Sequence, residues 1–220
     1  MQTRIDHLVI GAHDLRQGVD HIKACLGVEM PYGGVHEKMG THNHLMLLGE
    51  QVFLEVIAVN PDSHPPERPR WYGLDDPFVQ RRIREQPALL GWVVNTQDIR
   101  HFLQHAAFSF GKATSLRRGE LNWNFGLPDD GRLLAGGMLP YVIQWRTAFH
   151  PATRMADLGC RLLGLEIHHP YPFWLQSILE SVTADDLVEI AALPADCAPY
   201  MVARIQTPQG VRELHSDAGP

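Results

Sequence analysis

One succession of predicted elements, a strand, a helix and then three strands, occurs twice along this chain and limits the folds open to it. In the first copy, over residues 4–59, an apolar strand at 5–11 precedes a helix at 15–26 whose apolar residues recur at helical spacing. Glycine-rich turns with one short strand lead into a hairpin with strands at 42–48 and 52–58. This mixture of strands and helices predicts an α+β fold.

The second copy covers residues 88–146. An apolar strand at 88–96 is followed by Asp98, which is placed like Asp14 to cap a helix, and 98 − 14 gives an offset of 84 residues between the copies. The remaining strands of this copy are predicted at residues 120–127, 132–136 and 141–145. The chain is therefore predicted to contain two similar modules.

Two further segments do not belong to these modules. Residues 60–87 are rich in proline and aromatic residues and are predicted to form a long connection with a short helix at 77–84. Residues 160–214 follow the module pattern in part, with a strand, a helix and two more strands. We predict that they form a C-terminal βαββ extension, a partial module.

Composition narrows the class of protein. A hydrophobic content of 45% and a charged content of 20% are typical of a globular chain, and a net charge of −6 disfavours nucleic acid as a partner. The three cysteines are widely spaced and form no CxxC motif, which predicts free thiols. We expect no signal peptide and no membrane span, because no apolar run approaches the roughly 20 residues that a bilayer requires. A cytoplasmic location is the resulting expectation.

Two polar residues interrupt apolar strands of the first module. His7 lies in the strand at 5–11, on one face with Ile5 and Val9 by the period of two, and Glu55 lies in the strand at 52–58. A buried carboxylate needs a partner, because its burial alone is costly. The two side chains can be ligands of a divalent ion or form a hydrogen-bonded pair without a metal, and the residues themselves leave both alternatives open.

A polar cluster surrounds the glycines that precede the hairpin. His36 is a candidate acid or base near neutral pH, and Thr41 and Asn43 are candidates to orient a carbonyl or carboxylate group of a substrate. The alternative is a structural turn. Trp123 and Trp145, on strands of the second module, either line an apolar pocket that binds substrate or belong to the core.

Three basic residues of the second half have no assigned role. Arg117 and Arg118 could meet an anionic substrate, but an adjacent pair of this kind is typical of a solvated turn. His150 follows the second module closely and could cap its sheet.

The chain resembles glyoxalase-like members of the vicinal oxygen chelate superfamily. The resemblance covers residues 4–146 and is carried by DHLVIGAHDL at 6–15, by GG-x-H-x-x-x-GT-x-N at 33–43, by FLEVIAV at 53–59 and, more weakly, by GRLLAGGMLPYVIQW at 131–145. It implies paired β-α-β-β-β modules whose curved sheets form a cup. In metal-dependent members the ligands lie on the first and last strands of the modules.

Carried onto this sequence, the resemblance places His7 and Glu55 at ligand positions of the first module. At the offset of 84 residues, Gly91 lies over His7 and cannot be a ligand. In the last strands, the alignment of YVIQW at 141–145 with VFLEV at 52–56 places Gln144 over Glu55. The predicted metal ligands are therefore His7, Glu55 and Gln144, and Gln144 is also a candidate to contact substrate. The expected cofactor is a divalent metal ion or none.

Two functions remain open at this point, beside the alternative of a purely structural or degenerate module in which His7 and Glu55 form a buried pair. The first is a small-molecule enzyme of lyase, isomerase or dioxygenase type, in which Glu55 is a metal ligand or a base and His36 assists it. The second is a metal-free protein of the same fold that binds or sequesters a small molecule. In either case the expected partner is a small molecule, and the resemblance adds a homodimer as an expectation.

Overall fold

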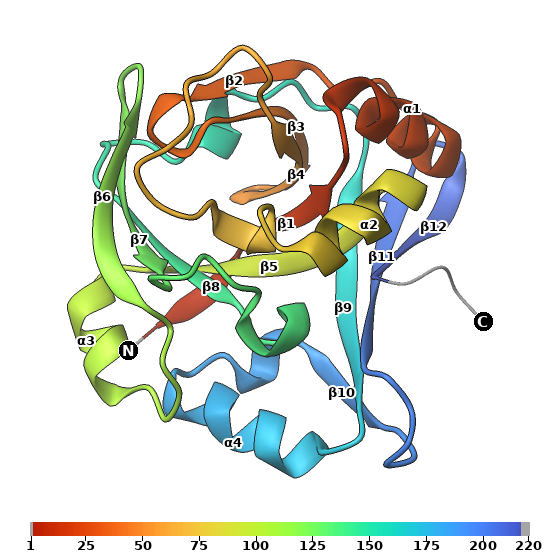
Figure 1. Ribbon diagram of the computed structural model, residues 1–220. Coiled ribbons are helices and arrows are strands. Elements are labelled where there is room, and N and C mark those ends of the chain that lie inside the picture. The colour runs from red at the N-terminus through yellow and green to blue at the C-terminus, as the bar shows by residue number, and fades with distance from the viewer. Residues whose placement is uncertain (1, 217–220) are drawn as a thin grey trace.

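A computed structural model describes residues 2–216. Its larger sheet has eight strands in the order β2-β3-β4-β1-β5-β8-β7-β6 and curls into the shape of a cup (Figure 1). The first half contains β1 (Thr3–Gly11), α1 (Leu15–Leu26), β2 (Tyr32–His36), β3 (Thr41–Gly49) and β4 (Val52–Val59). The second contains β5 (Ala88–Thr96), α3 (Ile99–His105), β6 (Lys112–Arg118), β7 (Leu121–Leu127) and β8 (Tyr141–Trp145).

The strand order is the same in both halves. Each first strand pairs in parallel with the last strand of its own module, β1 with β4 and β5 with β8. The two first strands, β1 and β5, pair antiparallel at the centre and join the modules into one sheet. The predicted pair of β-α-β-β-β modules around a cup, and with it the α+β class, is confirmed.

Helix caps explain where the first helix of each module begins. The Asp14 side chain accepts a hydrogen bond from the backbone N–H of Gln17 at 2.9 Å, and Asp98 accepts from the backbone N–H of His101 at 3.0 Å. The first helix ends at Gly27, whose φ of 73° is a left-handed conformation that glycine adopts without strain. Both caps lie where the sequence predicted them.

One strand of the second module was misplaced by sequence reasoning. The strand predicted at 132–136 is wrong, because this segment is a turn that includes η3 (Leu134–Gly137) with a positive φ at Ala135 and Gly136. The missing strand is β6, which lies at the edge of the sheet and leaves most of its side chains exposed or half-buried. An edge strand of this kind carries no apolar alternation for a sequence pattern to detect.

The connection between the modules places two aromatic side chains inside the cup. It contains η2 (Trp71–Gly73) and α2 (Pro77–Glu85), so the short helix predicted there is confirmed. Trp71 and Tyr72 are 3% and 1% exposed. Tyr72 has φ 58° and ψ 23°, a left-handed conformation that is unusual for a bulky residue and is often found at functional sites.

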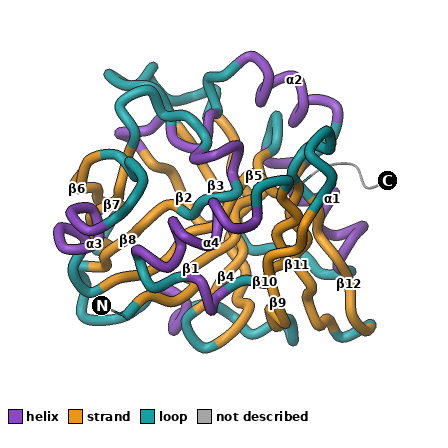
Figure 2. Tube along the Cα trace, turned by 90° about the horizontal axis from the view of Figure 1, so that it is seen from below, coloured by secondary structure: helices purple, strands orange, loops and turns teal. Residues whose placement is uncertain are grey.

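The C-terminal part forms a separate sheet with the strand order β10-β9-β11-β12, seen from below in Figure 2. Its elements are β9 (Arg161–His169), α4 (Pro172–Ser181), β10 (Glu189–Ala192), β11 (Tyr200–Thr207) and β12 (Gly210–His215). It has one strand more than the predicted βαββ pattern, and its first strand lies between the second and third. Short 3₁₀ turns complete the fold: η1 (Glu37–Met39), η4 (Pro151–Arg154) and η5 (Asp185–Leu187).

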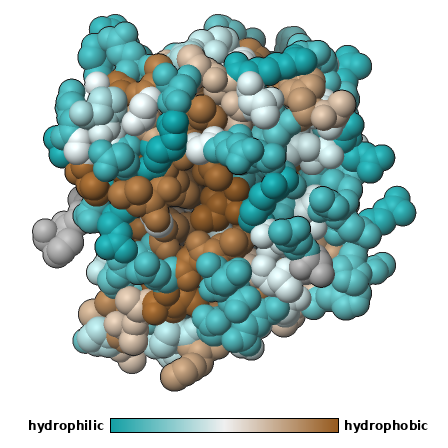
Figure 3. Space-filling model, turned by 180° about the vertical axis from the view of Figure 1, so that it is seen from behind, coloured by the Kyte–Doolittle hydropathy of each residue, from teal (hydrophilic) through white to brown (hydrophobic). Residues whose placement is uncertain are grey.

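Several sequence expectations concern the surface. The cysteines Cys25, Cys160 and Cys197 are free, and Cys197 is exposed. Within residues 2–216, no helix is both long enough and apolar enough to cross a membrane. Apolar residues gather in a hollow on the face opposite to that of Figure 1 (Figure 3). The homodimer and the cytoplasmic location stay predictions.

Candidate active site

A β-bulge in the first strand brings two neighbouring polar residues to the cup. The pairing of β1 with β5 shifts its register between Ile5 and His7, so Asp6 is an extra residue in the ladder. Asp6 and His7 are 0% and 4% exposed, and the carboxylate Oδ1 of Asp6 lies 2.6 Å from the imidazole Nδ1 of His7. The strict alternation that was predicted for this strand is therefore interrupted.

Asp6 is a meeting point for several elements. Its Oδ2 accepts hydrogen bonds from Asn95 Nδ2 at 2.8 Å, from the Trp145 indole N–H at 2.8 Å and from His150 Nε2 at 2.9 Å. Burial would raise the pKa of Asp6, but the hydrogen bonds from His150 and His7 outweigh it and hold this pKa below its usual range. Asp6 is thus a charged carboxylate that ties β1 to β5 and β8 of the second module.

The Asp6 contact fixes the orientation of His7. A carboxylate only accepts hydrogen bonds, so His7 Nδ1 carries the proton and Nε2 is directed into the cup. His7 Nε2 lies 3.7 Å from Glu55 Oε2 and 3.5 Å from the Tyr72 hydroxyl. The Phe53 ring stacks on the imidazole with 4.5 Å between centroids, which restrains its plane.

Asn43 connects Glu55 to a cation. Its Nδ2 donates to Glu55 Oε1 at 2.6 Å, and its Oδ1 accepts from Arg118 Nη1 at 3.0 Å. Asn43 and Glu55 are 1% and 5% exposed. The Asn43 amide therefore lies between a carboxylate and a guanidinium and forms one hydrogen bond with each.

His36 supports the same guanidinium. Arg118 Nη1 lies 3.3 Å from His36 Nε2, and because arginine only donates, this nitrogen must be unprotonated. His36 Nδ1 then donates to the Thr41 hydroxyl oxygen at 3.1 Å. Burial, and after it the charge of Arg118, lowers the pKa of His36 well below its usual value, so the imidazole is neutral at physiological pH.

These side chains surround one cavity of about 40 Å³. That volume is enough for roughly three water molecules. Its polar lining consists of His7, His36, Asn43, Glu55, Tyr72 and Arg118, and its apolar lining of Leu45, Phe53, Trp71, Trp123, Phe125, Ile143, Trp145 and Pro151. The cavity is therefore a small polar pocket with aromatic walls.

The profile of a family described as a glyoxalase-like domain matches residues 5–183. The chain belongs to this glyoxalase-like family. Of the solved structures, a hypothetical protein from Staphylococcus aureus is 14% identical with a TM-score of 0.59, covering 99% of this chain and 87% of its own. This likeness shows that the two proteins share a fold over nearly the whole of this chain.

Two more distant structures are enzymes by name. A mutant of 4-hydroxymandelate synthase from Streptomyces coelicolor is 14% identical with a TM-score of 0.46, covering 97% of this chain and 62% of its own. Methylmalonyl-CoA epimerase from Mycobacterium tuberculosis is 16% identical with a TM-score of 0.41, covering 68% and 91%. No curated protein matches the chain.

In this glyoxalase-like protein, most of the side chains that the sequence singled out meet at the cavity. His7, His36, Asn43, Glu55, Trp123 and Trp145 all line it. Thr41 is fully buried and contacts the cavity only through His36. Whether any of them contacts a substrate stays a prediction.

Gln144 lies on the other side of the sheet. Its Oε1 is 3.5 Å from Asn124 Nδ2, and its amide donates to the backbone carbonyl of Gln97. The expected correspondence of Gln144 to Glu55 is wrong because the alignment of the two last strands is off by one residue. His7 and Val93 lie opposite each other where β1 pairs with β5. In the first module His7 pairs with Phe53, and in the second Val93 pairs with Tyr141. Glu55 and Ile143 each lie two residues further along, so Ile143 corresponds to Glu55.

The residues present do not fit the predicted three-ligand metal site. His7 and Glu55 are the two predicted ligands that meet, and Ile143 stands at the corresponding position of the second module. Between residues 2 and 216, no three histidine, cysteine or acidic side chains converge in a way that could hold a metal ion.

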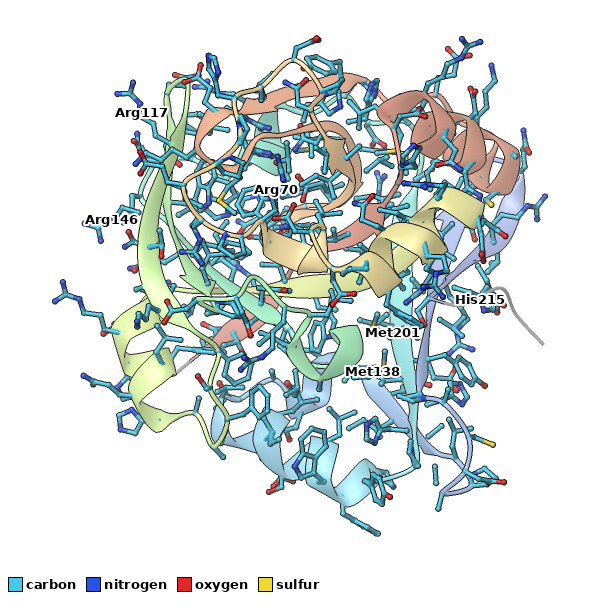
Figure 4. The ribbon with its side chains drawn as sticks, viewed as in Figure 1. Arg70, Arg117, Met138, Arg146, Met201 and His215 are labelled. Atoms are coloured by element: carbon cyan, nitrogen blue, oxygen red, sulfur yellow. The ribbon has the colours of Figure 1, made fainter. Side chains whose placement is uncertain are left out.

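Three site residues were missed by sequence reasoning. Asp6 precedes His7 and was expected to face the opposite side, and only the bulge reverses this. Tyr72 lies in a connection without periodicity. Arg118 was grouped with Arg117 as a solvated pair. Arg117 points away from the protein (Figure 4), whereas Arg118 lines the cavity.

Gly33 leaves room for the central amide. A Cβ atom on Gly33 would lie 2.3 Å from Asn43 Oδ1 and 2.8 Å from Leu45 Cγ. We expect Gly33→Ala to displace Asn43 and to lower the free energy of unfolding by about 1–3 kcal/mol. Urea unfolding measures this loss. Gly164→Ala is the matched control, because a Cβ there meets nothing within 4 Å. Equal stability of the two variants would contradict the clash.

The neutral state of His36 predicts a pH dependence of stability. Its pKa is lower in the folded protein than the usual 6.5, so the unfolded chain binds the proton more readily below that pH. The free energy of unfolding then falls as pH decreases below about 6.5, by at most about 1.4 kcal/mol per pH unit from this group. Urea unfolding at several pH values should show a smaller decrease for His36→Gln than for wild type. The exposed His13→Gln variant should keep the wild-type dependence, and an unchanged dependence in His36→Gln would refute the assignment.

Proposed function

We propose that this glyoxalase-like protein is an enzyme that removes a proton from a carbon atom next to a carbonyl group, with Glu55 as the base. The observation that supports this best is the arrangement around the Glu55 carboxylate. One oxygen accepts a hydrogen bond from Asn43 at 2.6 Å, and the other faces His7 Nε2 at 3.7 Å across the edge of the cavity. A base held in this way at a small cavity is placed to take a proton from a substrate bound there, as general base catalysis requires.

The neighbouring residues have positioning roles in this proposal. Asp6 keeps His7 in one tautomer, and His7 in turn limits the position of Glu55 Oε2. Burial, and after it the charge of Glu55, raises the pKa of Tyr72 well above its usual value, so its hydroxyl remains a neutral hydrogen-bond donor beside the base. His36 accepts a hydrogen bond from Arg118 and is assigned a positioning role instead of the acid–base role expected from the sequence.

The shape of the cavity favours a small reacting group. Its aromatic lining provides apolar surroundings, in which electrostatic interactions are stronger than in water. A carbonyl carbon with its neighbouring C–H group is about as large as the few water molecules that the cavity can hold. The rest of a larger substrate would have to lie outside the cavity.

Hydrogen exchange tests this proposal without knowledge of the physiological substrate. A panel of small ketones, aldehydes and keto acids is incubated with the protein in D₂O, with and without a chelator, and their C–H signals are followed by ¹H NMR. We expect loss of the signal next to the carbonyl group for some compounds at a rate proportional to protein concentration. If no compound exchanges, although some bind, the protein is instead a small-molecule binder of the same fold.

A further inference from the structure

Arg118 brings a positive charge into the cavity from the end of β6. The side chain passes over Gly34, where a Cβ atom would lie 3.3 Å from Arg118 Cδ. Its Nη1 donates to two neutral groups, Asn43 Oδ1 and His36 Nε2. Among the described residues, no carboxylate lies within ion-pair distance of this guanidinium. The cation is thus half-buried in the cup without a direct counter-ion.

Asn43 prevents the direct ion pair that the cup could otherwise form. Its amide stands between Arg118 and Glu55 and bonds to both, so the two charges lie one amide group apart. Each charged group therefore keeps a side that faces the cavity, which both residues line. A ligand that contacts both Arg118 and Glu55 therefore needs an anionic group for Arg118 and a second group for Glu55. The two groups must be separated by about the length of the Asn43 amide.

We infer that Arg118 binds the carboxylate of the substrate and that the substrate is a small α-keto acid whose acidic C–H group faces Glu55. This inference rests on the proposed function and adds the substrate class to it. In an α-keto acid a single carbonyl carbon separates the carboxylate from the carbon that carries the acidic protons, which matches the spacing that Asn43 sets. A planar guanidinium is suited to a planar carboxylate, because paired N–H groups can bind both oxygens.

Proton transfer from the substrate to Glu55 and back requires no further reactant. The C–H bond next to the ketone breaks, and its proton moves to the Glu55 carboxylate. The electron pair of that bond forms the C=C bond of an enolate while the carbonyl electron pair moves onto oxygen. Return of a proton from Glu55 to carbon restores the keto acid. The neutral Tyr72 hydroxyl and Arg118 are the donors that line the cavity where this negative charge develops.

Binding of oxamate tests the inference separately from catalysis. Oxamate has the size and charge of a small α-keto acid but no C–H group, and butane-2,3-dione is a neutral compound of similar shape. Isothermal titration should detect oxamate binding to the wild-type protein and much weaker binding of butane-2,3-dione and of inorganic phosphate. We expect Arg118→Gln to weaken oxamate binding by about tenfold or more, Arg118→Lys to weaken it less, and the exposed neighbour variant Arg117→Gln to bind like wild type.

Oxamate binding tests the role of Arg118, and proton exchange tests the role of Glu55, so the two roles can fail separately. Equal oxamate affinity of wild type and Arg118→Gln, both folded by circular dichroism, would overturn the role of Arg118 even if proton exchange occurs. Absence of oxamate binding, or equal binding of butane-2,3-dione or phosphate, would overturn the substrate class. Arg118-dependent oxamate binding without any exchange of keto acids would support this inference and overturn the proposed reaction.

Discussion

Glu55→Gln is expected to lower the rate of proton exchange by about 10²–10⁴-fold while the fold stays intact. The amide oxygen of glutamine can still accept the hydrogen bond from Asn43, and its NH₂ group can donate to His7 Nε2, so no buried polar atom loses its partner. What the variant lacks is a group that can take the proton from carbon. The exchange rate of the most reactive keto acid, measured by ¹H NMR, gives the size of the loss.

Glu50→Gln is the matched control for this variant. Glu50 is exposed in the turn between β3 and β4, so the same chemical change there should leave exchange at the wild-type rate. Thermal unfolding of both variants checks that the fold is retained. Exchange by Glu55→Gln at more than about one tenth of the wild-type rate would remove Glu55 from the role of base.

Asp6→Asn is expected to cause the largest loss of stability, about 3–5 kcal/mol in the free energy of unfolding. The carboxylate of Asp6 accepts hydrogen bonds from the side chains of four other residues. An asparagine side chain offers only one acceptor oxygen in its place. Its NH₂ group would face other donors in a fully buried site. The loss of the anion also removes the partner that selects the tautomer of His7, so exchange by the folded fraction should decrease as well. Urea unfolding at neutral pH measures the first effect.

Asp196→Asn provides the comparison for Asp6→Asn. Asp196 is exposed, and its replacement should change the free energy of unfolding by less than about 0.5 kcal/mol. A similarly small effect of Asp6→Asn would mean that the hydrogen bonds to Asp6 do not hold the modules together.

The fold could be predicted from the sequence because its signals are local and repeated. Asp14 and Asp98 are helix caps, and the apolar strands around them alternate with turns at similar spacing in both halves. The strand that escaped prediction, β6, is a polar edge strand, where burial imposes no pattern. The strand order of the C-terminal sheet could not be predicted either, since nothing in the sequence says which strands pair.

The candidate site was predictable in part for a related reason. His7 and Glu55 stand out as polar residues in apolar strands, and Asn43 belongs to the polar cluster around the glycines. All three meet in the structure. Gln144 was misplaced because the alignment of the last strands was off by one residue, and a slip of one residue moves a strand side chain to the other face. Asp6 and Arg118 depend on a bulge and on the curvature of the sheet, which bring together residues that are distant in sequence.

A crystal structure of the protein with bound oxamate would test the central claim most directly. The account predicts oxamate in the cavity between Trp71, Trp123 and Trp145, with its carboxylate at hydrogen-bond distance from Arg118 and its amide group next to Glu55. Oxamate in the reverse orientation, or bound only at another cavity such as the one lined by His21, Cys25 and His215, would contradict it.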